Sequence, residues 1–339
     1  MNMKNWLENI LSGKERKPIP ILSYPGAQYF NFNVASIVKD SDVQAKIMKK
    51  IADEFDTAAS VSVMDLSVEA ECFGSQITFS DTAVPAVTDT LITSAEDADN
   101  LKVPEVGSKR SGIFIDAIKK AKELITDRPV FAGAVAPFSL AGRLMDVTEI
   151  MYWCYDEPET VHMVLKKCTE FLINYIKALK SAGADGVILA EPVAGLLSPA
   201  LEEEFSAPYT KQLAEAVKDD EFVVVYHNCG MGVTRMKDSI YANSCDAYHF
   251  GNVIDLAEML EGSPADKPVM GNIDPVGMFK DGTPEMMKDT VYALLKKCSI
   301  YPNFLLSSGC DIPINATIEN ITAFFSATEE FYKNDDAVL

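Results

Sequence analysis

Short runs of apolar and β-branched residues recur along the chain, and most of them end abruptly at a turn or polar residue. Runs of this size and with such sharp ends are typical of strands that are buried on both faces. The sequence therefore predicts strands at residues 19–23, 59–64, 130–135, 186–190, 222–226, 247–250, 269–271 and 304–306.

Between most of these runs, apolar residues recur at helical spacing. The clearest segment is 158–182, whose apolar face begins at Val161 and runs to Leu179. Gly183 follows it, at the place where a glycine commonly ends a helix. Further helices are predicted at residues 45–54, 112–124, 201–217, 255–260, 284–297 and 316–332.

The alternation of strands with helices determines the predicted fold class. Parallel strands joined by right-handed crossovers give an α/β fold. The eight strand runs fit a (β/α)8 TIM barrel with a short N-terminal helical extension, residues 1–18, in a single domain spanning 1–339. The alternative is an open doubly wound sheet, which typically has a glycine-rich phosphate-binding turn after an early strand. The segment YPGAQYF at 24–30 is not such a turn.

Composition and charge narrow the classes of partner. Thirty Lys and Arg residues against fifty Asp and Glu residues give a net charge of −20, which disfavours nucleic acids and anionic membranes. Seven cysteines are too few for a disulfide framework, and no run of 18 apolar residues occurs. With no signal-peptide pattern at the N-terminus, these features lead us to expect a cytoplasmic protein.

The strongest candidate for chemistry is a histidine with two cysteines. His227 and Cys229 follow the run 222–226, and positions two apart in extended backbone point the same way. Cys310 follows the last run, and the ends of barrel strands converge on one mouth. Two thiolates and an imidazole suit Zn²⁺ and leave a fourth position for substrate. The alternative is that these cysteines are small buried apolar residues and that the histidine only bonds a loop.

Three further residues are candidates for catalysis. Glu191 follows the run 186–190 and could ligate the metal, act as a base or accept a hydrogen bond beside it. His249 ends a strand and could reach the mouth or fix a neighbouring loop. Asp65 follows the second run, where acids could instead favour a helix N-terminus.

The remaining candidates are expected to bind substrate. They share a position just after a predicted strand, where side chains face the mouth. They are Tyr24, Glu69, Glu71, Phe138, Asn272 and Asp274.

Seven motifs distributed over residues 64–313 carry a family resemblance. They are MDLSVEAECFG (64–74), PVFAGAVAPFSLAGRLMD (129–146), AGADGVILAEPVAGLLSP (182–199), VVVYHNCG (223–230), GNIDP (271–275), GTPE (282–285) and SSGCDIP (307–313). With these motifs the sequence resembles the uroporphyrinogen decarboxylase superfamily. Within it, the sequence is similar to the corrinoid-dependent methyltransferases, the branch that includes the methylcobamide:coenzyme M enzymes.

The resemblance implies a (β/α)8 barrel and a zinc site at His227, Cys229 and Cys310. It also implies methyl transfer between a corrinoid and a small-molecule acceptor or donor such as a thiol. The corrinoid would be methylcobalamin or the group of a separate carrier protein, since the chain has no D-x-H-x-x-G motif of the kind that ligates cobalt in such carriers.

Two alternatives to methyl transfer stay open within this resemblance. Members of the decarboxylase branch resemble one another in an arginine-rich segment after the first strand, which holds the acidic tetrapyrrole. The corresponding segment here, LSYPGAQYFN, contains no arginine. Arg143 is the nearest candidate, and one guanidinium cannot balance the many carboxylates of a tetrapyrrole. The alternatives are therefore a tetrapyrrole decarboxylase and a non-catalytic barrel that binds a corrinoid or tetrapyrrole.

Overall fold

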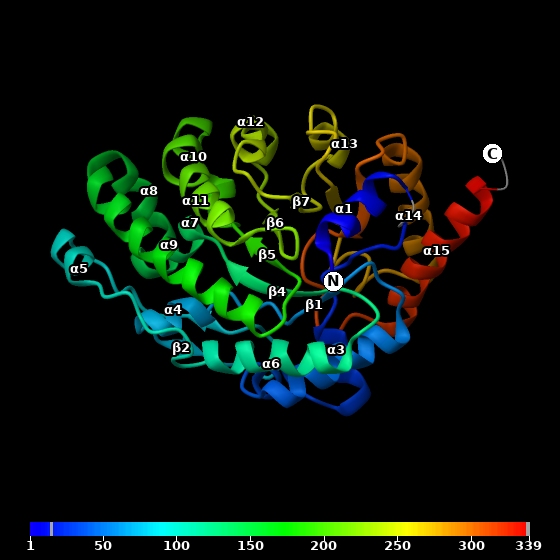
Figure 1. Cartoon of the computed structure of the whole chain (residues 1–339), viewed down its shortest axis with the longest axis horizontal. Helices are drawn as coiled ribbons and strands as arrows, with labels where there is room; N and C mark the ends of the chain where they lie inside the picture. The colour runs from blue at the N-terminus through cyan, green and yellow to red at the C-terminus, as the bar shows by residue number, and fades with distance from the viewer. Residues whose placement is uncertain (14–15, 337–339) are drawn as a thin grey trace.

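A curved parallel sheet forms the centre of the molecule (Figure 1). The computed structural model describes residues 1–13 and 16–336. In that part of the chain the main sheet has seven parallel strands, each hydrogen-bonded to the next in chain order. The strands are β1 (Ser60–Val61), β4 (Val130–Val135), β5 (Gly186–Ala190), β6 (Val223–Asn228), β7 (Ala247–Phe250), β8 (Val269–Ile273) and β9 (Phe304–Ser308). The predicted α/β class and seven of the eight predicted strands are confirmed.

The predicted first strand, 19–23, does not join the sheet as a strand, so the prediction of eight sheet strands was wrong at this position. The chain here still bonds to β9 and to the residues that lead into β1. Ile19 donates its N–H to the Leu306 carbonyl at 3.0 Å, and the Pro18 carbonyl accepts from Ala58 at 3.0 Å. Pro18 and Pro20 have no N–H to donate, so a continuous ladder cannot form here.

Helices surround the outside of the sheet (Figure 1). They are α2 (Val34–Ile37), α3 (Ser41–Glu54), α4 (Val68–Phe73), α5 (Ala95–Asn100), α6 (Ser111–Leu124), α7 (Pro137–Met145), α8 (Val147–Asp156), α9 (Pro158–Ser181), α10 (Pro199–Phe205), α11 (Ala207–Val217), α12 (Lys237–Tyr241), α13 (Leu256–Leu260), α14 (Pro284–Cys298) and α15 (Ile318–Asp336). Short 3₁₀ helices are η1 (Tyr24–Phe30), η2 (Val193–Leu196) and η3 (Val233–Arg235). None of the helices in the described ranges has the length and hydrophobicity needed to span a bilayer.

One predicted helix, 201–217, is divided in two. It forms α10 and α11, with Ser206 between them. Pro208 in the first turn of α11 explains the break, because proline donates no backbone hydrogen bond and disfavours helical geometry at the residue before it. An antiparallel hairpin, β2 (Ile77–Thr78) and β3 (Ala86–Val87), stands apart from the main sheet.

Alternate residues of each strand face opposite sides of the sheet. One set, which includes Val224 and Tyr226, packs against the outer helices. The other set, which includes Val223, Val225 and Ala247, forms a separate inner cluster. Position 227 continues this inner set, so the alternation that buries the core also directs His227 inward.

Helix α1 (Met3–Leu11) covers the amino-terminal end of the inner cluster. Its first N–H groups, those of Met3 and Lys4, donate to the Asp220 carbonyl at 2.9 and 3.2 Å. Trp6 packs edge-on against Phe131 with ring centroids 5.3 Å apart. This end is therefore closed, which leaves the carboxyl ends of the strands for a site. Residues 14–15 of the predicted extension and 337–339 of the predicted domain lie outside the described residues.

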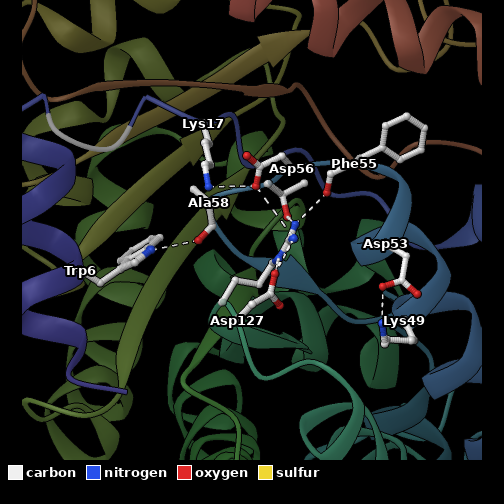
Figure 2. A network of polar contacts seen from close by, with 10 residues as sticks. Trp6, Lys17, Lys49, Asp53, Phe55, Asp56, Ala58 and Asp127 are labelled. Atoms are coloured by element: carbon white, nitrogen blue, oxygen red, sulfur yellow. Dashed lines mark hydrogen bonds and ion pairs between the residues drawn. The ribbon is translucent and has the colours of Figure 1, made fainter.

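A polar network joins the segments that enter β1 and β4 (Figure 2). Arg128 Nη1 donates to the Phe55 carbonyl at 2.7 Å and lies 3.2 Å from Thr57 Oγ1. Arg128 Nη2 lies 2.8 Å from an oxygen of Asp127. Trp6 donates its indole N–H to the Ala58 carbonyl at 3.0 Å. The Arg128 side chain is only 11% exposed, so its bonds are partly shielded from water.

We expect Arg128→Met to lower the free energy of unfolding by about 1.5–3 kcal/mol, the range for hydrogen bonds that involve a charged group. Urea denaturation of both proteins measures the difference. Lys49→Met is the matched control, because Lys49 pairs with Asp53 on the surface of α3, and its loss should cost about 0.3–0.5 kcal/mol. Equal losses in the two variants would contradict a structural role for Arg128.

Candidate metal centre

The structure brings together the three residues that the sequence selected as metal ligands. His227 lies in β6, Cys229 directly follows that strand, and Cys310 follows β9. Their ligand atoms all lie within 4.8 Å of one another. The Cys310 sulfur is 3.7 Å from Nε2 of His227. Two sulfurs and one imidazole nitrogen at this separation form a donor set that suits Zn²⁺.

Two glycines allow the loops to approach this closely. A Cβ at Gly251, just after β7, would lie 2.6 Å from Cα of Cys229. A Cβ at Gly309, just before Cys310, would lie 2.6 Å from the backbone nitrogen of Asn252. Real Cβ atoms do not come that close, so both positions need glycine for the cysteines to meet.

The two thiols affect each other's ionisation. A hydrogen bond with Cys310 is the largest cause that lowers the pKa of Cys229, and His227 lowers this pKa further. The same bond and burial raise the pKa of Cys310. The pair therefore favours one thiolate and one thiol, which is halfway to the doubly deprotonated state that a metal requires.

A hydrogen-bonded chain behind His227 determines which of its nitrogens carries hydrogen. The Ser307 hydroxyl donates to the Ile19 carbonyl at 2.8 Å, so it can only accept from Nε2 of His249, which is 2.8 Å away. Nδ1 of His249 is then unprotonated and must accept from Nδ1 of His227, at 2.8 Å. The lone pair of His227 is left on Nε2, the atom that faces Cys310. Burial lowers the pKa of His249, which keeps its imidazole neutral.

A cavity of about 440 Å³ opens beside these residues. Most of its lining is apolar, including Met64, Leu66 and Ile314, and its polar lining includes Tyr24 and Arg143. Its volume is that of a small-molecule site. Among the predicted binding residues, the cavity contains Tyr24, whose hydroxyl donates to the Met64 carbonyl at 3.2 Å.

Asp65 and Glu71 bind an arginine instead of facing the cavity. Arg110 pairs with Asp65 through Nη1 and with Glu71 through Nε, the latter at 2.6 Å. Asp65 also accepts from the backbone and hydroxyl of Ser67, at 3.0 and 2.6 Å. Both carboxylates are therefore occupied within the protein.

Glu69 is almost fully buried at the start of α4. Its Oε1 accepts from the Val135 N–H at 2.9 Å, whereas Oε2 has no hydrogen-bond partner in the part of the chain that the structure describes. Burial raises the pKa of Glu69 to about 7.

Glu191 does not join the cysteine cluster. Its two oxygens accept from the backbone N–H groups of Phe138 and Ser139, at 3.1 and 2.5 Å, at the start of α7. Burial raises the pKa of Glu191 to about 7. In the structure the carboxylate accepts hydrogen bonds from α7, and a contact with a metal in the cysteine cluster stays a prediction. The Phe138 side chain is fully buried in the core.

Asn272 and Asp274 shape loops and do not line the cavity. Asn272 Nδ2 donates to the carbonyls of Gly251 and Ile254, at 2.8 and 3.0 Å. Asp274 Oδ1 accepts from the N–H groups of Val276 and Gly277, both at 2.9 Å. They therefore stabilise the connections that follow β7 and β8.

No role was assigned from the sequence to Ser307 or to the hairpin turn 82–85. Alternation from Leu305 could have placed Ser307 on the inner face, beside the histidines. The turn lines the cavity through Thr82, Ala83, Val84 and Pro85, and no local pattern indicates such a long-range contact.

Comparison with known proteins shows the family. The sequence matches the family description "Uroporphyrinogen decarboxylase (URO-D)" over residues 9–331. It is 28% identical over 257 residues to the methylcobamide:CoM methyltransferase MtbA of Methanosarcina acetivorans, which covers 73% of this chain and 72% of that protein. It is also 28% identical over 243 residues to uroporphyrinogen decarboxylase 2, chloroplastic, of Arabidopsis thaliana, which covers 69% of this chain and 60% of that protein.

The solved structure of a methyltransferase from Methanosarcina mazei has a similar fold. The two structures match with a TM-score of 0.87 at 22% sequence identity, over 98% of this chain and 99% of the other. An identity this low supports the fold alone, and the sequence match over 9–331 identifies the family. The chain belongs to the uroporphyrinogen decarboxylase family.

Proposed function

We propose that the protein transfers a methyl group between a corrinoid and a small molecule, with a zinc ion held by His227, Cys229 and Cys310. The observation that carries the proposal is the meeting of two thiols with the Nε2 lone pair of His227 beside a small-molecule cavity. The methylcobamide:CoM methyltransferase relative is named for a corrinoid substrate, which supports this reaction class.

Zinc at this site would act as a Lewis acid that keeps a substrate thiol in its thiolate form near neutral pH. In the transfer to a thiol, the sulfur lone pair forms a bond to the methyl carbon. The cobalt–carbon bond breaks, and its electron pair stays on cobalt. The apolar cavity walls, including Met64 and Leu66, exclude water from the attacking sulfur. The reverse direction, from a methylated donor to reduced cobalt, uses the same geometry.

Exposed apolar side chains around the mouth offer a docking surface for the apolar face of a corrinoid ring. Leu196, Met231 and Val253 follow β5, β6 and β7, and their side chains are exposed. The loops that carry them touch one another, since a Cβ at Gly195 would lie 2.7 Å from Cα of Gly230. A cavity of about 440 Å³ has the size of a small-molecule site. We infer that a carrier protein presents the corrin ring over these exposed apolar residues.

Decarboxylation of a tetrapyrrole is the second candidate, and the family match with Arabidopsis uroporphyrinogen decarboxylase favours it. Such a substrate carries many carboxylates. Among the described residues that line the cavity, Arg143 is the only arginine or lysine. Methyl transfer therefore fits the charge of this cavity better.

The direct test is to incubate the zinc-loaded protein with methylcobalamin and a panel of thiols. We expect the absorbance of methylcobalamin to fall and a methylated thiol to appear, both dependent on the protein. Production of coproporphyrinogen from uroporphyrinogen, with no methyl transfer, would instead establish the second candidate.

Loss of the proposed ligands should remove the metal. We expect about one zinc ion per chain in the purified protein, and little in Cys229→Ser or Cys310→Ser. Metal analysis measures the content, and circular dichroism confirms that the variants are folded.

Two variants serve as controls for this prediction. Cys72→Ser changes a cysteine outside the cluster, and Glu191→Gln changes the carboxylate that caps α7. Both should keep their zinc. Full zinc retention in both cysteine variants of the cluster would remove these residues as ligands.

The hydrogen-bonded chain behind His227 should control zinc affinity. Ser307→Ala removes the acceptor of the His249 Nε2 hydrogen. The nitrogen that carries hydrogen in each of the two imidazoles is then no longer fixed. We expect zinc to bind about tenfold more weakly or worse, the size of effect seen when a residue behind a metal ligand is lost. Competition with a chelator of known affinity measures the change.

Ser308→Ala is the matched control, because the Ser308 hydroxyl accepts from the Ile21 N–H, a bond outside this chain of imidazoles. Its zinc affinity should stay close to that of the unmodified protein. If Ser307→Ala binds zinc as tightly as Ser308→Ala, the chain does not set the state of His227.

A further inference from the structure

Three buried polar side chains share one face of α10 and α11, and we call them the Glu202 face. They are Glu202, Ser206 and Thr210, each at most 1% exposed. The N–H of Ser206 donates to the Glu202 carbonyl, and that of Thr210 to the Ser206 carbonyl, both at 3.0 Å. This helical spacing of four places the three side chains on the same side. Within the described residues, Oε1 of Glu202 and both hydroxyls make no hydrogen bond.

The two hydroxyls of the Glu202 face are not bonded to their own helix. A buried serine or threonine in a helix can donate to the carbonyl four residues before it. Thr169 in α9 does so, to the Leu165 carbonyl at 2.7 Å. Ser206 and Thr210 make no such bond, so their hydrogens are available to an acceptor on the buried side of the helices.

A tyrosine with a similar need lies on the strand beside them. Tyr226 is buried in β6, on the side of the sheet that packs against the outer helices. Its hydroxyl oxygen accepts from Nδ2 of Asn228 at 3.1 Å, and no described residue accepts its hydrogen. Burial raises the pKa of Tyr226, and the charge of Glu202 raises it further, so the hydroxyl lies near that carboxylate. Glu202 is fixed from the other side, since Ser239 of α12 donates to its Oε2.

The balance of donors and acceptors selects the class of ligand. The hydroxyl hydrogens of Tyr226, Ser206 and Thr210 lack an acceptor, whereas Oε1 of Glu202 lacks a donor. A metal cation would bind the oxygens but could accept none of the hydrogens. Water accepts and donates, and a buried water typically makes about three hydrogen bonds to polar groups of this kind.

We propose that ordered water binds between the Glu202 face and Tyr226, and that the completed chain of hydrogen bonds positions the turn that carries Cys229. The protein part of this chain is direct. When the Tyr226 hydrogen goes to water, a lone pair of its oxygen is left for Nδ2 of Asn228, and Oδ1 of Asn228 accepts from the Gly230 N–H at 2.9 Å. Asn228 and Gly230 stand on either side of Cys229. Tyr226 and Asn228 are therefore positioning residues, and this role rests on the proposed function only where zinc is measured.

A crystal structure tests the water directly. We expect water density about 2.7–3.2 Å from the Tyr226 hydroxyl and from Oε1 of Glu202. A direct bond between these two groups, with no water between them, would overturn the water site. Crystals soaked in rubidium chloride supply the second arm, because an anomalous peak at this position would show a cation and would also overturn it.

A double-mutant cycle tests the bridge in solution. Thr210→Val and Tyr226→Phe each remove a hydroxyl with little change of shape. If the two hydroxyls share a water, their losses of stability in urea should not add when the changes are combined. Thr169→Val is the matched control, because the Thr169 hydroxyl bonds Leu165 of its own helix, and its loss should add to that of Tyr226→Phe. Additivity in both pairs would contradict a shared water.

The positioning role is measured at Cys229 in the metal-free protein. Tyr226→Phe removes the acceptor of Asn228 and should let the turn open, so that iodoacetamide alkylates Cys229 faster. Tyr248→Phe is the matched control, because Tyr248 pairs with Tyr226 across β6 and β7, is equally buried, and donates to the Tyr241 carbonyl at 3.1 Å. Mass spectrometry of the labelled peptide gives the rate. Equal rates in the two variants would refute the positioning role.

Zinc affinity is the second readout. We expect zinc to bind about tenfold more weakly to Tyr226→Phe and with unchanged affinity to Tyr248→Phe, although both changes lower the melting temperature. If the unmodified protein binds no zinc but the two variants differ in alkylation, the positioning role stands and the metal centre is refuted. If zinc binds equally to all three proteins and the alkylation rates are equal, the metal centre stands and the positioning role is wrong.

Discussion

The register of the parallel sheet is the constraint on which the candidate site depends. Ala190 pairs with His227, and His227 pairs with His249, so these residues occupy one row across β5, β6 and β7. Because side chains alternate between the faces, the row that continues the inner core also directs both imidazoles inward, where they meet at 2.8 Å. A slip of one residue would turn both imidazoles toward the outer helices.

Polar groups inside such a core need hydrogen-bond partners. Side chains that find these partners within the protein have a structural role, whereas those that do not are candidates for binding a ligand. His249 and Ser307 complete a chain that ends at a backbone carbonyl, so every donor in that chain has an acceptor. Asp65 and Glu71 are likewise satisfied by Arg110. Against this background, the thiol pair stands out because its sulfurs lie close to one another and to Nε2 of His227 beside a cavity.

Much of this arrangement could be predicted from sequence, because it follows from local pattern. Bounded apolar runs located seven strands, and the two-residue spacing of His227 and Cys229 predicted that they share a face. The prediction of a strand at 19–23 failed because Pro18, just before it, and Pro20 within it have no N–H to donate to a ladder, although the segment is apolar. The partner of Glu191 could not be predicted, since a side chain that leaves a strand can turn to a neighbouring helix as easily as to the mouth.

Glu191 shows how such a long-range contact can still serve the site. Its backbone N–H donates to the His227 carbonyl at 2.8 Å, and its carboxylate accepts from the first N–H groups of α7. One residue thus connects the strand that carries His227 to the helix that carries Arg143. Glu191 therefore holds the start of α7 against β6 through one backbone hydrogen bond and two bonds that its own carboxylate accepts.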